Sequence, residues 1–253
     1  MTFALLALAT DPARAAERVD VELVLLADST GSIDDAEIRL QRQGYAAALA
    51  HPDVLGAIAQ GYEQRIAVTF VEWGDEDSQD VVVPWTVVDG AGSAAAFGAA
   101  LLEAPRRAFG RNAIGSALAF GQRLIETNAV EGHRKVMDLS GDSANSWNGV
   151  PLAVARAEAL AAGIVINGLA ITCRGECSGR PVGYDLEGAF ERLIVGGPAS
   201  FVVTAEDDAG FAEAVRRKLL LEVAGVDPGD GGRPAGATGR AGSGGARLAT
   251  SAP

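Results

Sequence analysis

The stretch Val21-Glu-Leu-Val-Leu-Leu-Ala-Asp-Ser-Thr-Gly-Ser32 decides the fold of this chain. Its first seven residues are almost continuously apolar, which is typical of a strand covered on both faces in a parallel sheet. The polar pentapeptide Asp28-Ser29-Thr30-Gly31-Ser32 follows directly, with Gly31 giving the backbone freedom for a tight turn. Helix-forming residues then run from 34 to 50, with acidic residues in the first turn, where the helix dipole favours them.

The rest of the chain alternates short apolar runs with longer segments of helical period. Strands are expected at 65–73, 80–88, 134–140, 164–171 and 201–204, and helices at 92–103, 112–128, 150–162, 186–194 and 208–223. The polar segment between the 65–73 and 80–88 strands suits a hairpin. We therefore predict an α/β fold, Rossmann-like and doubly wound, with a mainly parallel sheet, one antiparallel edge hairpin and helices on both faces.

Composition excludes several classes of function. The 253 residues carry a formal charge of −12, so a nucleic-acid backbone would be repelled. Two His and two Cys exclude an iron–sulfur protein and argue against a zinc enzyme. No apolar run is long enough for stable membrane insertion. Any metal chemistry must therefore rest on oxygen ligands.

The two ends of the chain differ from its middle. Residues 1–17 contain a short apolar stretch and an Ala-Arg-Ala sequence, which indicate a signal-like leader although a basic start is missing. Residues 227–253 are rich in Gly, Ala and Pro, so we expect a disordered tail. One folded domain is expected over residues 18–226.

Cys173 and Cys177 bracket a Gly in the polar sequence Cys-Arg-Gly-Glu-Cys. A turn would bring them within disulfide range, and an oxidised pair favours a periplasmic or secreted protein. Two reduced, unlinked thiols are the alternative. A zinc site is disfavoured because no further Cys pair or nearby His completes four ligands.

Two polar clusters follow strands of the predicted sheet. Asp28, Thr30 and Ser32 follow the first strand, and Asp142 follows the 134–140 strand. The carboxyl ends of parallel strands meet at one edge, where ligands of such sheets bind. Carboxylate and hydroxyl oxygens suit Mg²⁺, Mn²⁺ or Ca²⁺. The alternative is that Asp28 or a Ser merely caps the next helix.

Asp-x-Thr-x-Ser after a buried first strand, with Asp142 after a later one, resembles the metal-ion-dependent adhesion site of von Willebrand factor type A domains. Val-Met-Asp-Leu-Ser-Gly-Asp-Ser-Ala-Asn (136–145) and Asn-Ala-Ile-Gly-Ser-Ala-Leu (112–118) further resemble the bacterial family catalogued as domain of unknown function 1194. The resemblance implies that Asp28, Thr30, Ser32 and Asp142 bind a divalent cation. It places Asn112 where the type A pattern has Thr, so the amide oxygen replaces a hydroxyl, and Ser143 where the pattern has Gly.

An enzyme is the alternative to a binding module. Gly141-Asp142-Ser143 resembles the nucleophile block of some serine esterases, but a Ser nucleophile needs a base such as His. We expect His51 and His133 to lie far from Ser143. A phosphatase would need a second Asp where Thr30 stands. Whether the chain is an enzyme is uncertain, and a metal-dependent hydrolase using the same cation stays the alternative.

Three further features have competing interpretations. The acidic residues Asp75, Glu76, Asp77 and Asp80 favour a solvated hairpin turn over a calcium loop. Asp138 lies inside a buried strand and must be paired, either beside the metal or in a local network. Trp147 follows Asp142 closely and either packs or contacts a partner at the metal rim.

These features together predict a non-catalytic, cation-dependent protein-binding module for adhesion or scaffolding. Magnesium is the expected ion, with Mn²⁺ and Ca²⁺ as alternatives. An acidic side chain of a partner protein would complete the metal's ligands, since largely neutral or shared ligands leave the ion with net positive charge.

Overall fold

The computed structural model describes residues 16–172 and 182–225. Their centre is a six-stranded sheet in the order β3-β2-β1-β4-β5-β6. Its strands are β1 (Glu17–Asp28), β2 (Ile66–Trp73), β3 (Gln79–Val88), β4 (Val130–Gly141), β5 (Val165–Ile171) and β6 (Val202–Ala205). Neighbouring strands are parallel except β2 and β3, which form an antiparallel hairpin at one edge. The predicted fold class is confirmed.

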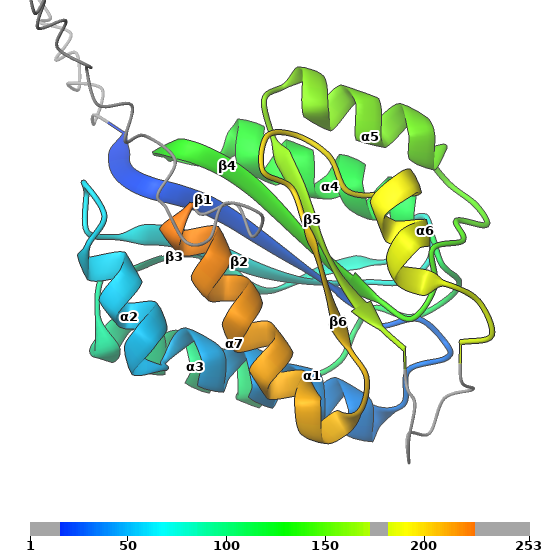
Figure 1. Cartoon of the computed structure of the whole chain (residues 1–253), viewed down its shortest axis with the longest axis horizontal. Helices are drawn as coiled ribbons and strands as arrows, with labels where there is room; N and C mark the ends of the chain where they lie inside the picture. Colours follow the sequence, from blue (N-terminus) through cyan, green and yellow to red (C-terminus); the bar gives the residue numbers. More distant parts are fainter. Residues whose placement is uncertain (1–15, 173–181, 226–253) are drawn as a thin grey trace, which may run out of the picture.

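Helices cover both faces of the sheet (Figure 1). One face carries α1 (Asp35–Leu49), α2 (Pro52–Ala59), α3 (Ala91–Glu103) and α7 (Asp208–Ala224). The other carries α4 (Ile114–Thr127), α5 (Leu152–Ala161) and α6 (Leu186–Leu193). Within β1, Leu23 and Leu25 pack into the first core and Val24 and Leu26 into the second. Burial on both sides explains why β1 is almost continuously apolar.

Helix α1 begins where its sequence predicts. The carboxylate of Asp34 accepts hydrogen bonds from the backbone N–H groups of Ala36 (2.7 Å) and Glu37 (2.9 Å). The Glu37 carboxylate in turn accepts from the Asp34 backbone N–H at 2.9 Å. This capping box fixes the point at which the chain leaves the loop after β1 and enters the helix.

Two elements differ from expectation. Helix α2 is not predicted by the apolar pattern, because it is one short amphipathic segment started by a proline and a histidine N-cap. Strand β4 begins at Val130, four residues earlier than expected, so His133 lies inside the strand. The early part of β4 alternates between exposed and half-buried residues and therefore lacks the apolar signal of a buried strand.

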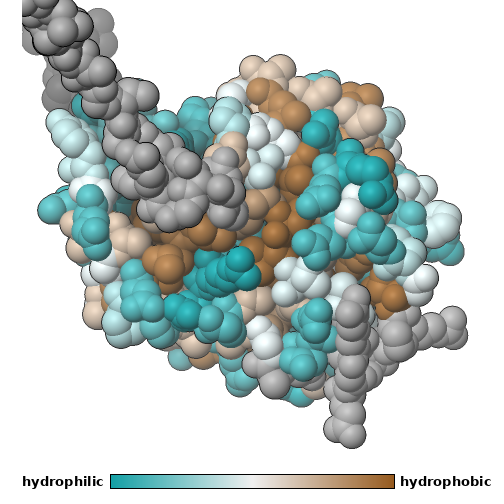
Figure 2. Space-filling model, viewed as in Figure 1, coloured by the Kyte–Doolittle hydropathy of each residue, from teal (hydrophilic) through white to brown (hydrophobic). Residues whose placement is uncertain are grey.

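In the view of Figure 1, apolar residues gather near the middle of the surface beside β5 and again over α5, whereas much of the remaining surface is hydrophilic (Figure 2). Within residues 16–172 and 182–225, no helix combines the length and the hydropathy of a membrane-spanning segment.

Candidate metal centre

The candidate site lies where β1 and β4 end side by side. These two strands are parallel neighbours, with Leu26 of β1 opposite Leu139 of β4. Asp28 is the last residue of β1, and Asp142 follows Gly141, the last residue of β4. From β1 the chain continues to β2 on one side, whereas β4 lies on the other side. The site thus occupies the topological switch point, the position at which open α/β sheets bind ligands.

Hydrogen bonds order the loop after β1. The Asp28 carboxylate accepts from the backbone N–H of Thr30 at 2.8 Å. The hydroxyl oxygens of Thr30 and Ser32 lie 3.1 Å apart, and the Ser32 side chain also hydrogen-bonds to Asp142. The loop therefore brings one carboxylate and two hydroxyls toward the carboxylate after β4.

Asn112 approaches from the loop before α4. Its backbone carbonyl accepts a hydrogen bond from the Trp147 N–H at 2.8 Å, which joins this loop to the loop after β4. A second link joins it to the loop after β1, since the Gly31 N–H donates to the Gly110 carbonyl at 2.9 Å. All five predicted site residues thus lie in three loops that hydrogen-bond to one another.

The glycine that this arrangement requires is Gly110 rather than Gly31. Gly110 has a φ of +120°, which side chains rarely adopt, and an added Cβ would lie 2.6 Å from the Cβ of Asp75. At Gly31 an added Cβ would lie 3.7 Å from its nearest neighbour, which is ordinary contact. The expectation that Gly31 supplies the unusual backbone conformation is therefore wrong.

Arg106 is a site residue that sequence reasoning missed. Its guanidinium donates to the Ser29 hydroxyl (3.0 Å) and to the backbone carbonyls of Ser29 (2.9 Å) and Ile33 (3.0 Å). Arg106, which lies between α3 and α4, therefore fixes the conformation of the loop after β1. It lies 77 residues from Ser29 along the chain, so no local pattern indicates the contact.

The surroundings of the site disfavour the charged forms of its two carboxylates. Burial and the nearby charge of Asp142 together raise the pKa of Asp28 to about 7, although hydrogen bonds from Thr30 and from the Asp142 backbone oppose the shift. Burial also raises the pKa of Asp142. Neither carboxylate has an ion-pair partner among residues 16–172 and 182–225. A cation between them would offset this cost.

Two buried oxygens of the site also lack hydrogen-bond partners in the described part of the chain. They are Oδ2 of Asp28 and Oδ1 of Asn112. Unsatisfied buried acceptors are costly, so their presence in one place needs an explanation. The donor set of carboxylate, hydroxyl and amide oxygens fits a hard divalent cation. Among the described residues no group of three or more His, Cys, Asp or Glu side chains is arranged to hold a metal ion, so the hydroxyls and the amide are essential to this fit.

The site opens into a hollow of about 430 Å³. Trp147 stands on its rim with 71% of its surface exposed. The hollow is lined by Thr30, Gly31, Ser32, Gly110, Arg111, Asn112 and Trp147. No lysine, aspartate or glutamate is among the described lining residues of this hollow.

The esterase interpretation finds no support in the contacts of Ser143. Its hydroxyl accepts from the Asn145 backbone N–H at 3.2 Å. His51 caps α2 by accepting from the Asp53 N–H, and His133 lies 3.1 Å from a carboxylate oxygen of Glu63. Within the described residues neither histidine hydrogen-bonds to Ser143, so no base activates this hydroxyl.

The remaining predicted features make contacts of their own rather than joining the candidate ligands. Asp138 pairs with Lys218 of α7 at 2.6 Å, so its network is local. The acidic residues 75–77 occupy the turn between β2 and β3, where the Asp75 carboxylate accepts from the Asn148 amide and the Glu76 N–H. Cys173 and Cys177 lie outside the described residues.

A comparison with models of protein families finds a match to most of the chain. The model of the family "Protein of unknown function (DUF1194)" matches residues 18–227. A comparison with curated protein sequences finds no match.

Solved structures share the fold at low sequence identity. Proximal thread matrix protein 1 from the mussel byssus, in a structure with a zinc occupied MIDAS motif, has a TM-score of 0.59 at 16% identity. The match covers 83% of this chain and 49% of the mussel protein, so this chain spans about half of that relative.

Two bacterial pilus proteins also share the fold. The vWF domain of the type V pili tip protein Mfa5 from Porphyromonas gingivalis has a TM-score of 0.52 at 10% identity, covering 84% of this chain and 98% of that domain. The pilus adhesin SpaC from Lactobacillus rhamnosus GG has a TM-score of 0.56 at 14% identity, covering 82% of this chain and 31% of SpaC. The fold is therefore von Willebrand factor type A-like.

Proposed function

The chain belongs to the DUF1194 family and has a type A-like fold, and from this premise we propose that it is a divalent-cation-dependent protein-binding module. The observation that carries the proposal is the pair of unsatisfied buried oxygens, on Asp28 and Asn112, at the edge where β1 and β4 end. Asp28, Thr30, Ser32, Asn112 and Asp142 would hold the cation. Magnesium is the ion we propose, because its preferred ligands are oxygens of these kinds.

When bound, the cation supplies net positive charge at an otherwise acidic, buried place. Of the five proposed ligands only Asp28 and Asp142 carry a carboxylate, and the two hydroxyls and the amide would add no negative charge, so the ion would not be over-neutralised. A carboxylate of a partner protein is the ligand that this charge attracts. The chain's own residues exclude bulk water from Asp28, which is fully buried, and hold the loop in place through Arg106.

The rim of the hollow favours a protein partner. Trp147 exposes a large apolar surface, yet its backbone is fixed by the hydrogen bond to Asn112. Exposed aromatic side chains on a rigid backbone are typical anchors of protein interfaces, because little entropy is lost when they are covered. Arg111 adds an exposed positive charge beside Trp147. We propose that both contact the segment around the partner's acidic residue.

A displayed library of random peptides tests this function on the full chain. Selection in Mg²⁺ should yield peptides that are released by a chelator and that lose binding when their Asp or Glu is replaced by the amide. Trp147→Ala should weaken these peptides by about tenfold or more while leaving Mg²⁺ affinity unchanged. Tyr62→Ala is the matched control, because Tyr62 is an aromatic residue with 85% exposure far from the site. Peptides that bind equally well in chelator would contradict the proposal.

We also propose that the protein is exported, to the periplasm or beyond the cell. The support is the sequence of residues 1–17 and the pair Cys173 and Cys177. The pair should be oxidised, which restricts the loop they share but stabilises the whole chain little, because so short a ring hardly constrains the unfolded state. Thiol quantification on unreduced, denatured protein from its native compartment is the test. Two free thiols per chain would contradict the disulfide and weaken the case for export.

A further inference from the structure

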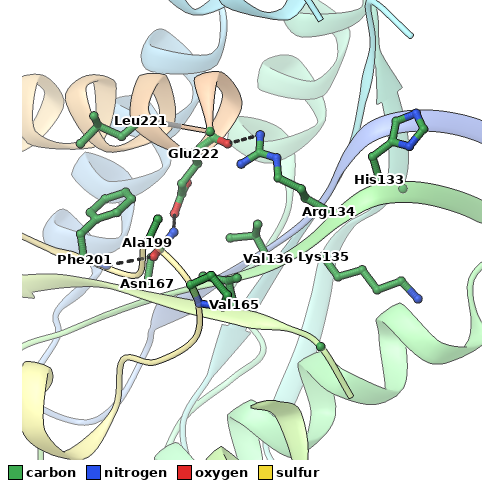
Figure 3. Close-up of a pocket in the computed structure, with 14 residues that line it drawn as sticks. His133, Arg134, Lys135, Val136, Val165, Asn167, Ala199, Phe201, Leu221 and Glu222 are labelled. Atoms are coloured by element: carbon green, nitrogen blue, oxygen red, sulfur yellow. Dashed lines mark hydrogen bonds between the residues drawn. The ribbon is translucent and has the colours of Figure 1, made fainter. Parts of the chain in front are cut away.

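A second cavity lies at the opposite end of the sheet from the metal centre. It has a volume of about 380 Å³ and lies between the early part of β4, the start of β5, the loop before β6 and the end of α7 (Figure 3). Arg134, in its wall, is eight residues before Asp142, so the two sites are about 26 Å apart along the strand direction. The cavity is thus independent of the metal centre.

Glu222 is a lining residue of this cavity, and its buried carboxylate keeps one oxygen unused. The residue is only 1% exposed. Its Oε1 accepts from Lys218 Nζ at 2.5 Å and from Asn167 Nδ2 at 3.0 Å, and Figure 3 shows it descending from α7 toward Asn167. Its Oε2 has no hydrogen-bond partner in the described part of the chain. Lys218 also pairs with Asp138, so one ammonium serves two buried carboxylates.

Arg134 offers the complementary unused groups. Its Nη2 donates to the backbone carbonyls of Glu222 (2.7 Å) and Val223 (2.8 Å) at the end of α7. Within residues 16–172 and 182–225, its Nε and Nη1 make no hydrogen bond, and no carboxylate lies within ion-pair distance. Burial lowers the pKa of Arg134, and the negative charges of Glu222 and Asp20 oppose this shift without either carboxylate reaching ion-pair distance.

The remaining wall is apolar and contains one strained residue. Figure 3 places Val136, Val165, Phe201 and Leu221 around the two charged side chains, whereas His133 and Lys135 point away. Ala199, in the loop before β6, has a φ of +56°. A left-handed conformation at a residue other than glycine is strained, and such residues cluster at ligand sites.

We propose that this cavity binds a free α-amino acid with an aliphatic or aromatic side chain. Its carboxylate contacts the unused guanidinium nitrogens of Arg134, its ammonium contacts Oε2 of Glu222, and its side chain lies against the apolar wall. A zwitterion adds no net charge to the cavity while offering one group of each sign. A simple acid leaves Oε2 of Glu222 unpaired, and a simple amine leaves Arg134 unpaired. The volume is at the small end for ligand cavities and suits a molecule of this size.

Three ligands that differ by one charged group test the proposal on the unaltered full chain. They are L-leucine, 4-methylpentanoate, which lacks the ammonium, and 3-methylbutan-1-amine, which lacks the carboxylate. Ligand-observed saturation-transfer NMR should show saturable leucine binding and at least about tenfold weaker binding of both analogues. No leucine binding at about 10 mM, or an analogue that binds as well as leucine, would overturn the proposal.

Two variants that each remove one charge then assign the contacts. Arg134→Gln and Glu222→Gln should each weaken leucine binding by about tenfold or more. Arg156→Gln is the matched control, because Arg156 also donates to a backbone carbonyl, that of Val195 at 2.7 Å, but lies outside the cavity. Equal losses in the variants and the control would show a general structural effect and overturn the assignment. The comparison of ligands on the unaltered chain does not depend on how well the variants fold.

Discussion

At the scale of single residues, Asn112 distinguishes this site from the type A pattern that it resembles. The amide oxygen of Asn112 can only accept hydrogen bonds, whereas a hydroxyl can also donate one. This oxygen is buried and has no hydrogen-bond partner in the described part of the chain. Because this ligand is uncharged, it does not neutralise any of the positive charge of the proposed cation. The identity of residue 112 therefore sets the balance between metal affinity and the attraction for a partner's carboxylate.

Changing Asn112→Asp should separate these two properties. A third carboxylate should raise Mg²⁺ affinity by about tenfold or more and weaken Mg²⁺-dependent binding of acidic peptides, because the ion's charge is neutralised within the chain. Calorimetric titration with Mg²⁺ and a peptide-binding assay measure the two effects. Asn145→Asp, an exposed position in the neighbouring loop, is the control and should change neither. An unaltered Mg²⁺ affinity in Asn112→Asp would argue against Asn112 as a ligand.

At the scale of elements, α7 is fastened to the middle of the sheet by charges rather than by apolar packing alone. Lys218 is fully buried and lies between Asp138 of β4 (2.6 Å) and Glu222 (2.5 Å). Two acids and one ammonium are electrically neutral when one acid keeps its proton. Burial raises the pKa of Asp138 to about 7, against the opposing effect of Lys218, which agrees with a retained proton. This network explains the carboxylate inside a buried strand.

The raised pKa of Asp138 makes stability depend on pH. The folded chain holds this proton up to about pH 7, whereas the unfolded chain releases it near the ordinary value of 3.8. Stability from this group is therefore present below the unfolded value and falls as pH rises toward 7. Asp138→Asn cannot titrate, so it should gain more than about 1 kcal/mol relative to the unaltered chain between roughly pH 4 and pH 8. Urea denaturation across this range measures the difference, and a constant difference would contradict the retained proton.

The sequence predicts elements well where burial is complete and poorly where it is partial. The apolar pattern of β1 is clear because both faces of the strand are covered. Its buried Glu22 accepts hydrogen bonds from N–H groups of Gly132 (2.7 Å) and Asn128 (2.6 Å). The start of β4 and the whole of α2 carry mixed patterns and were not expected. Among the loops, the convergence of Asp28 and Asp142 follows from strand order. The clamp by Arg106 and the requirement for Gly110 arise only from tertiary contact.

At the scale of the whole molecule, one sheet separates two chemically different ends. The carboxyl ends of β1 and β4 bring together unsatisfied oxygens, and the opposite end places an acid and a guanidinium in an apolar cavity. Helix α7 runs along one face and contributes Glu222 to the second of these ends. Because the elements that form both ends belong to one folded unit, each site can be tested by substitution in the intact chain.

Residues 227–253 should be dispensable for the stability of this unit. Their Gly-, Ala- and Pro-rich composition offers little apolar surface to bury, and α7 already ends at Gly225, whose φ of +64° forms the helix C-cap. A chain that stops after Val226 should melt within about 2 °C of the full chain. Differential scanning calorimetry measures this. A substantially lower melting temperature would show that the segment packs against the domain.

Metal binding by Asp28 is the central claim, and calorimetric titration of Mg²⁺ and Mn²⁺ tests it most directly. The unaltered chain should show saturable binding at one site, and Asp28→Ala should show none. Asp138→Asn, which also alters a fully buried carboxylate but lies away from the site, should bind as the unaltered chain does. Equal heats from the unaltered chain and Asp28→Ala would contradict the account.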